Sequence, residues 1–211
     1  MCGICGVYPF HRVPLEKARL KAMCDVIFHR GPDEEGFYID RDIALGIRRL
    51  SIIDLSTGQQ PIHNEDKTVW TVFNGEIYNH REIRDNLLKE GHVFYTNADT
   101  EVIVHLYEKY GEDFVTKLNG MFAIAVWDSS QQTLVLARDR LGIKPLCYYL
   151  NGEKLVFGSE IKSILIEGTV ERKLHLPALD YYLTYGYIPA PDTIFQGIKK
   201  LPPGHILICR K

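Results

Sequence analysis

The sequence lacks an excess of charge of either sign, because its 25 lysines and arginines nearly balance its 27 aspartates and glutamates. Such a chain has no electrostatic field that would draw it to nucleic acid or to an anionic membrane. No apolar run approaches the roughly 20 residues of a membrane span, and the N-terminus lacks the layout of a secretion signal. We therefore expect a cytoplasmic protein that binds its ligand in a pocket and binds neither nucleic acid nor membranes.

The sequence also lacks the motifs of two common catalytic classes. It contains neither a Gly-x-x-x-x-Gly-Lys-Ser/Thr phosphate loop nor a His-Glu-x-x-His zinc motif. Its cysteines number five and lie in unrelated contexts, which argues against a disulfide framework. Phosphate-loop nucleotide chemistry, zinc proteolysis and a disulfide-stabilised fold therefore have no support.

The 211 residues, 45% of them hydrophobic, suit one well-packed domain. Helix-like segments alternate with short strands that pair with sequence neighbours, which predicts an α+β fold of sheets stacked between helices. The Asn74-Gly75 pair is a turn signal before a helix that Asn79 would cap. We predict helices over 15–28, 79–91, 99–111, 112–118 and 176–185, and strands over 2–8, 36–39, 43–47, 50–54, 69–73, 121–127, 133–137, 147–150 and 155–158.

The second residue, Cys2, carries the strongest indication of chemistry. Removal of Met1 would place a thiol and a free α-amine on one residue, and an amine of pKa about 7.7–8.0 exchanges protons near neutral pH. Cys2 would then be a nucleophile with its own base. The alternatives are a residue without a role and a redox or metal pair with Cys5. That pair is disfavoured, because positions three apart in a strand face opposite ways and structural zinc needs four ligands.

Asn74 and Gly75 are the best candidates for stabilising the oxyanion that forms when a thiol attacks a carbonyl. The side-chain amide of Asn74 and the backbone N–H of Gly75 would be aimed at one oxygen, with no Cβ in the way at Gly75. An ordinary tight turn is the alternative.

Three charged residues would select a small zwitterionic substrate. Arg49 offers a guanidinium fork for a carboxylate, and Glu76 and Asp99 offer counter-charges for an ammonium group. Taken one at a time, each is as well explained as a solvated charge or a helix cap. Together with Cys2 they would form a complete site for an amino-acid amide.

Seven blocks along the chain carry a resemblance to a known family. They are Cys2-Gly3-Ile4-Cys5-Gly6, His29-Arg30-Gly31-Pro32-Asp33, Arg49-Leu50-Ser51-Ile52-Ile53-Asp54, Asn74-Gly75-Glu76-Ile77-Tyr78-Asn79, Asp99-Thr100-Glu101, Gly120-Met121-Phe122-Ala123 and Arg138-Asp139-Arg140-Leu141-Gly142. In this order they resemble class II glutamine amidotransferases, in particular the N-terminal glutaminase domain of glutamine-dependent asparagine synthetases.

The resemblance implies an N-terminal-nucleophile hydrolase fold, a four-layer αββα sandwich of two antiparallel sheets between helices. It implies that Cys2 attacks the side-chain amide of glutamine through a thioester, releasing ammonia and then glutamate. Asn74 and Gly75 correspond to the oxyanion hole and Arg49 to the ligand of the substrate α-carboxylate. Glu76 and Asp99 lie among the groups that hold the ammonium end.

One part of the family pattern is absent from the sequence. Family synthetases continue into an ATP-dependent domain with a Ser-Gly-Gly-x-Asp-Ser loop, which this sequence does not contain. We therefore expect a glutaminase domain over 2–185 and an extension over 186–211 toward a synthetase domain or subunit that receives the ammonia. No cofactor or metal is expected for the glutaminase half, whereas ATP and Mg²⁺ would serve the synthetase half.

Two alternatives remain open at this point. One is an amidotransferase domain that serves another acceptor, such as a sugar or a surface-polysaccharide precursor. The other is a catalytically silent module that binds glutamine, which gains weight if Met1 is retained and the Cys2 amine is an amide. A homodimer is among the assemblies we expect.

Overall fold

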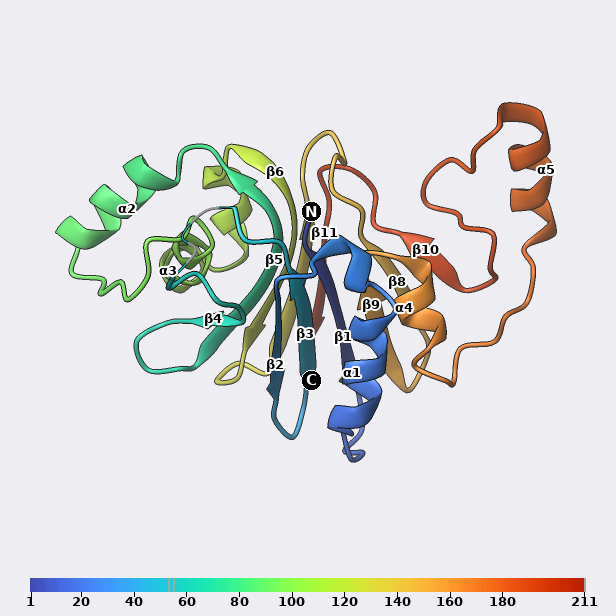
Figure 1. Cartoon of the computed structure of the whole chain (residues 1–211), viewed down its shortest axis with the longest axis horizontal. Helices are drawn as coiled ribbons and strands as arrows, with labels where there is room; N and C mark the ends of the chain where they lie inside the picture. The colour runs from blue at the N-terminus through green and yellow to red at the C-terminus, as the bar shows by residue number, and fades with distance from the viewer. Residues whose placement is uncertain (53, 55, 211) are drawn as a thin grey trace.

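The computed structural model describes residues 1–52, 54 and 56–210, and these residues form two antiparallel sheets stacked face to face (Figure 1). The first sheet has the strand order β10-β8-β9-β1-β3-β2, and the second has the order β11-β7-β6-β5-β4. The strands are β1 (Gly3–Pro9), β2 (Glu34–Ile39), β3 (Ala44–Arg49), β4 (Ile62–His63), β5 (Val69–Ile77), β6 (Gly120–Asp128), β7 (Thr133–Arg138), β8 (Cys147–Leu150), β9 (Lys154–Gly158), β10 (Ile198–Lys200) and β11 (Ile206–Arg210).

Helices cover the outer faces of both sheets (Figure 1). They are α1 (Lys17–Asp25), η1 (Phe28–Arg30), α2 (His80–Lys89), α3 (Glu101–Tyr110), η2 (Gly111–Lys117), α4 (Ile161–Leu165) and α5 (Leu176–Tyr185). Helices α1 and α4 pack on the first sheet, and α2 and α3 lie on the side of the second. Helix α5 stands apart at one end of the molecule (Figure 1).

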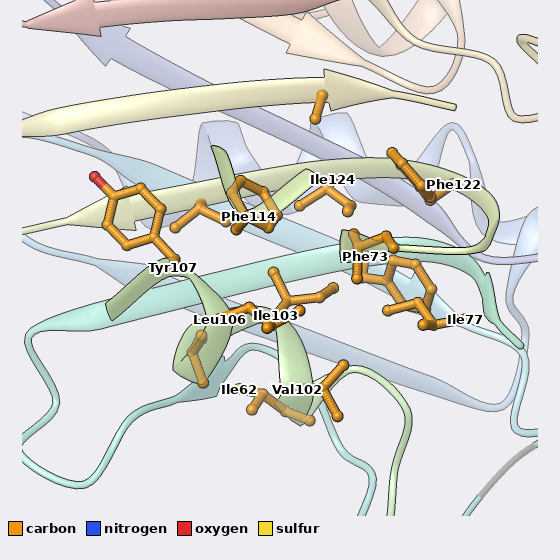
Figure 2. Packing of buried hydrophobic residues seen from close by; sticks show 14 of the residues in the cluster. Ile62, Phe73, Ile77, Val102, Ile103, Leu106, Tyr107, Phe114, Phe122 and Ile124 are labelled. Carbon is orange, nitrogen blue, oxygen red and sulfur yellow. The ribbon is translucent and has the colours of Figure 1, made fainter. Parts of the chain in front are cut away.

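The two sheets and the helices on their outer faces make four layers, and three apolar cores lie between them. The central one joins the two sheets, with Ile4 and Leu45 from the first facing Ala125 and Leu136 from the second. A second layer lies between the first sheet and α1 and α4. The third lies under α3, where Ile103 and Leu106 pack with Phe73 of β5 (Figure 2). Three cores between four layers are the predicted αββα sandwich.

Local pattern predicted most elements well. Helix α3 is buried all round over its first seven residues, and it ends before Gly111, whose φ of 55° is readily adopted by glycine. The hairpins β6–β7 and β8–β9 also form as predicted. Strand β1 is central in its sheet, between β9 and β3, so its first residues are fixed from both sides.

Three local predictions were wrong. Asn74-Gly75 is no turn, because β5 continues straight through it to Ile77. Asn79 makes no capping hydrogen bond to α2, since its side chain bonds to the backbone of Lys117 and Asn119. Residues 50–52 and 54 form no strand, and position 53 of that predicted strand lies outside the described residues.

The segment after α5 takes part in both sheets. Strand β10 pairs with β8 at the edge of the first sheet, and β11 pairs with β7 at the edge of the second. Residues of the predicted extension over 186–211 thus pair with strands of both sheets.

Candidate active site

All six residues predicted for the site line one pocket of about 190 Å³. The pocket lies where the chain before β1, the end of β3 and the second half of β5 meet. The fold thus brings together six residues from distant parts of the sequence: Cys2, Arg49, Asn74, Gly75, Glu76 and Asp99.

Cys2 is held by backbone contacts at the start of β1. Its Sγ lies 3.4 Å from the N–H nitrogen of Leu50 and 3.6 Å from the Leu50 carbonyl oxygen. Burial raises the pKa of the Cys2 thiol, and the Leu50 N–H and the positive N-terminus offset this only in part. The thiol therefore needs a base to become a nucleophile.

Cys5 lies on the other face of β1, as the strand period predicts. Its Sγ lies 3.4 Å from Sγ of Cys24, in the core between the first sheet and α1. Cys2 packs instead against the core between the sheets. The Cys2–Cys5 pair is therefore excluded as a joint redox or metal site.

Asn74 has a buried donor that no described residue satisfies. The residue is 1% exposed, and its Nδ2 has no hydrogen-bond partner among the described residues. A buried unsatisfied donor costs about 1–3 kcal/mol, so such groups are rare without a ligand to bind them. In this pocket the donor is positioned to receive an oxygen atom.

The backbone N–H of Gly75 points away from β6. Its partner across the sheet is Phe122, whose N–H and C=O both bond to Asp139 on the far side. In an antiparallel pair of this kind the backbone groups of both residues point outward. On the same open edge of β5, Gln60 bonds to Phe73 and Asp99 accepts the Ile77 N–H, so the Gly75 N–H lies between them.

Glycine is required at position 75 by close packing and not by a turn. A Cβ there would lie 2.1 Å from the Met121 carbonyl oxygen on β6. The φ of Gly75 is not positive, in contrast to the glycines that end helices. The close approach of β6 is thus a reason for glycine at this position that the sequence did not indicate.

Two carboxyl groups, those of Asp99 and Glu76, line the pocket. Asp99 is buried, and its Oδ2 accepts the Ile77 N–H at 2.9 Å. Burial raises the pKa of Asp99. Burial also raises the pKa of Glu76, and the nearby Asp99 raises it further. A cationic group placed between them would relieve both effects.

Arg49 is fixed at the end of β3. One of its terminal nitrogens donates to Glu34 at 2.7 Å and the other to the Asp54 carbonyl at 2.7 Å. Gly58 lets this loop approach, because a Cβ there would lie 2.6 Å from Arg49 Nη2. The guanidinium is thus held rigidly in the pocket wall.

Two positioning residues were missed. Arg30 donates from Nε to the Cys2 carbonyl at 2.9 Å and from Nη1 to Glu160 at 3.0 Å. Asp139 accepts from the N–H groups of Phe122 and Lys144. Both residues lie in sequence blocks that carry the family resemblance. Their hydrogen bonds join segments that are distant in the sequence, so no spacing pattern predicts these roles.

Lys144 was also missed as a pocket residue. It is 5% exposed and lines the pocket beside Met1, whose sulfur lies 3.3 Å from Lys144 Nζ. Its charge tends to lower the pKa of Glu76. A buried cation beside the N-terminus adds a positive charge that sequence pattern did not indicate.

The family model for the glutamine amidotransferase domain matches residues 1–211. The chain belongs to this family. Asparagine synthetase (glutamine-hydrolyzing) 1 of Bacillus subtilis strain 168 is 40% identical over 207 residues, covering 97% of the chain and 33% of the relative. Amidase chry2 of Gibberella zeae is 39% identical over 223 residues, covering 100% of the chain and 32% of the relative. The amidotransferase domain thus spans about a third of the length of these curated relatives.

A solved structure confirms the fold. The glutamine phosphoribosylpyrophosphate amidotransferase of B. subtilis superposes with a TM-score of 0.69 at 19% identity, covering 99% of this chain and 47% of that one. The predicted N-terminal-nucleophile sandwich is therefore confirmed for this amidotransferase domain. None of its described helices is long and apolar enough to cross a membrane.

Proposed function

We propose that this domain hydrolyses the side-chain amide of glutamine through a thioester on Cys2. The observation that carries the proposal is the unsatisfied Nδ2 of Asn74, buried in the same pocket as the Cys2 thiol. Structures seldom retain such a donor without a ligand atom to receive. An oxyanion on the attacked amide carbon supplies that atom, and Gly75 N–H supplies the second donor.

The other pocket residues match the two ends of glutamine. Arg49 has the planar fork that suits an α-carboxylate. Glu76 and Asp99 form an acidic pair that an α-ammonium group would neutralise. The amide end would then lie toward Cys2, Asn74 and Gly75. This assignment of roles follows the chemistry of the lining residues.

The reaction needs the N-terminal amine of Cys2 as the base, and therefore needs Met1 removed. The amine takes the thiol proton as sulfur attacks, and it gives a proton to the departing nitrogen, which leaves as ammonia. Water then cleaves the thioester to glutamate and restores the thiol. Arg30 would keep the Cys2 backbone in place during both steps through its bond to the Cys2 carbonyl.

The N-terminus and the activity should be measured on one sample. Intact mass reports whether Met1 is gone, and the processed protein should release ammonia from glutamine. A glutamine-mimicking electrophile should label Cys2 and leave the half-buried Cys209 unmodified. A form that retains Met1 should be inactive, and Cys2→Ala should lose hydrolysis while keeping glutamine binding. A processed wild-type protein that neither releases ammonia nor is labelled would refute the proposal and favour a silent binding module.

We further propose that the ammonia serves asparagine synthesis, with ATP and Mg²⁺ used by a synthetase domain or subunit. The support is the relative named a glutamine-hydrolyzing asparagine synthetase, of which this chain covers only 33%. The chain is nearly as similar to a protein named as an amidase, at 39% identity. Transfer of the ammonia to an acceptor other than aspartate is therefore the second candidate function. Asparagine formed from aspartate by the whole protein would support the first, and glutamine hydrolysis without asparagine would support the second.

An exposed apolar face on and after α5 fits a synthetase partner. Tyr182, Leu183, Tyr185 and Tyr187 are 53–74% exposed, a concentration of apolar side chains that is unusual on a free surface. We propose that the remaining two thirds of a synthetase-length protein covers this face. The expected homodimer and cytoplasmic location stay predictions.

A further inference from the structure

Away from the active site, four side chains with metal-binding atoms converge on one point. They are Glu65 in the β4–β5 connection, His92 between α2 and α3, and His105 and Glu108 on α3. One ligand atom from each lies within 4.8 Å of every other. None of them lines the active-site pocket.

Several separations between these side chains are close to those of a tetrahedral zinc site. Zinc–nitrogen and zinc–oxygen bonds of about 2.0–2.1 Å put neighbouring ligands about 3.3 Å apart. Oε2 of Glu108 lies 3.0 Å from Nδ1 of His105 and 3.5 Å from Nδ1 of His92. Oε2 of Glu65 lies 3.6 Å from Nδ1 of His105, and the other oxygen of Glu65, Oε1, lies 3.9 Å from Nδ1 of His92. Because the four ligand atoms lie within 4.8 Å of one another, the longer separations would have to shorten for all four atoms to bind one ion.

The surroundings hold the ligands in orientation. The second oxygen of Glu108 accepts from Asn64 Nδ2 at 2.8 Å, and Glu65 Oε1 accepts from the Val93 N–H at 2.7 Å. His105 is fully buried, and its Nε2, which has no hydrogen-bond partner within residues 1–52, 54 and 56–210, lies 3.8 Å from Glu101 Oε1. Histidine ligands to metals commonly present their second nitrogen to a carboxylate in this way.

We propose that Glu65, His92, His105 and Glu108 bind one divalent transition-metal ion of the zinc type. Two imidazoles and two carboxylates suit such an ion, and the two carboxylates neutralise its charge. Four protein ligands close the coordination sphere, which makes the site structural. It would tie the β4–β5 connection and the segment before α3 to α3 itself, the helix that begins two residues after Asp99. This inference is independent of the proposed glutaminase function.

Cobalt(II) is a suitable probe, because a tetrahedral site gives it visible absorption bands. The protein should carry Cys2→Ala, so that no active-site thiolate competes, and should first be treated with a chelator. One equivalent of Co²⁺ should give tetrahedral bands without thiolate-to-cobalt charge transfer, and Zn²⁺ should abolish them. At a hundred times its dissociation constant, Zn²⁺ should raise the Tm by about 5–10 °C.

Two variants and a control decide the assignment. Mutation of a residue that only orients a metal ligand typically weakens metal binding about 10–100-fold. His92→Gln and Glu108→Gln remove a ligand, so they should weaken Co²⁺ binding by more than this and should abolish the rise in Tm with Zn²⁺. Glu101→Gln should weaken binding within that range. His11→Gln, at an exposed histidine outside the cluster, should bind like the parent. Absent bands, or bands unchanged in folded His92→Gln and Glu108→Gln proteins, would overturn the proposal.

Discussion

At the scale of single residues, the pocket concentrates groups that are poorly satisfied in the unliganded protein. Nδ2 of Asn74 is buried without a hydrogen-bond partner in the described part of the chain, and burial raises the pKa values of the Cys2 thiol and the Asp99 carboxyl. The unpaired donor and the ionised Asp99 carboxylate oppose folding near neutral pH and would be relieved by a bound substrate, whereas the raised pKa of Cys2 only keeps its thiol protonated until a base acts. Such residues trade stability for function.

Asp99→Asn should separate stability from binding. The raised pKa means that ionised Asp99 opposes folding at neutral pH, and this penalty disappears as the pH falls through the folded-state pKa. The variant should therefore be more stable near neutral pH when unliganded, and less sensitive to pH. It should also lose about 2–5 kcal/mol of glutamine binding, because the substrate ammonium loses a buried counter-charge.

Urea unfolding and the KM for glutamine test this expectation. Asp113→Asn, at an exposed carboxylate, is the matched control and should change neither quantity. Wild-type KM should also rise on acidification, beginning above the usual carboxylate range, because protonation removes the counter-charge. An Asp99→Asn protein that is less stable yet binds glutamine normally would contradict the assigned role.

At the scale of elements, the sequence predicted the helices and hairpins that depend on local pattern. It did not predict the features that depend on contacts between distant strands. Helix and strand periods gave α5 and the hairpins with nearly correct bounds. Asn74-Gly75 was misread as a turn, because the carbonyl of Met121 that requires glycine is 46 positions away. The six pocket residues followed from chemistry and family resemblance. Arg30 and Asp139 did not, since they act by bonding distant backbone groups.

Gly75→Ala should impair catalysis by moving β5. The added Cβ would lie 2.1 Å from a backbone oxygen of β6, so one strand must shift and carry the Gly75 N–H with it. Loss of one oxyanion donor typically lowers kcat about 10²–10³-fold. KM should change much less, because Arg49 and Asp99 remain.

Steady-state kinetics on folded protein test this prediction. Gly152→Ala, in the β8–β9 turn, is the control, since nothing lies within 4 Å of its added Cβ and it should keep full kcat. A normal kcat in the Gly75→Ala protein would show that the Gly75 N–H does not stabilise the oxyanion.

At the scale of the whole molecule, the segment after α5 closes the sandwich. Leu201 is 3% exposed in the core between the sheets. Its N–H donates to the Leu146 carbonyl at 2.9 Å, and its carbonyl accepts from Arg138 Nη1 at 2.7 Å. A residue bound in this way belongs to the domain core, whatever follows it in the protein.

Leu201→Ala should therefore destabilise the domain. Truncating a buried leucine typically costs about 2–5 kcal/mol, because apolar contacts are lost and a cavity remains. Leu183→Ala makes the same chemical change on α5, where the side chain is 74% exposed, and should change stability by no more than about 0.5 kcal/mol. Urea unfolding of both variants decides between a core segment and a linker. Equal stabilities would mean that residues after 185 are an extension that the amidotransferase fold does not need.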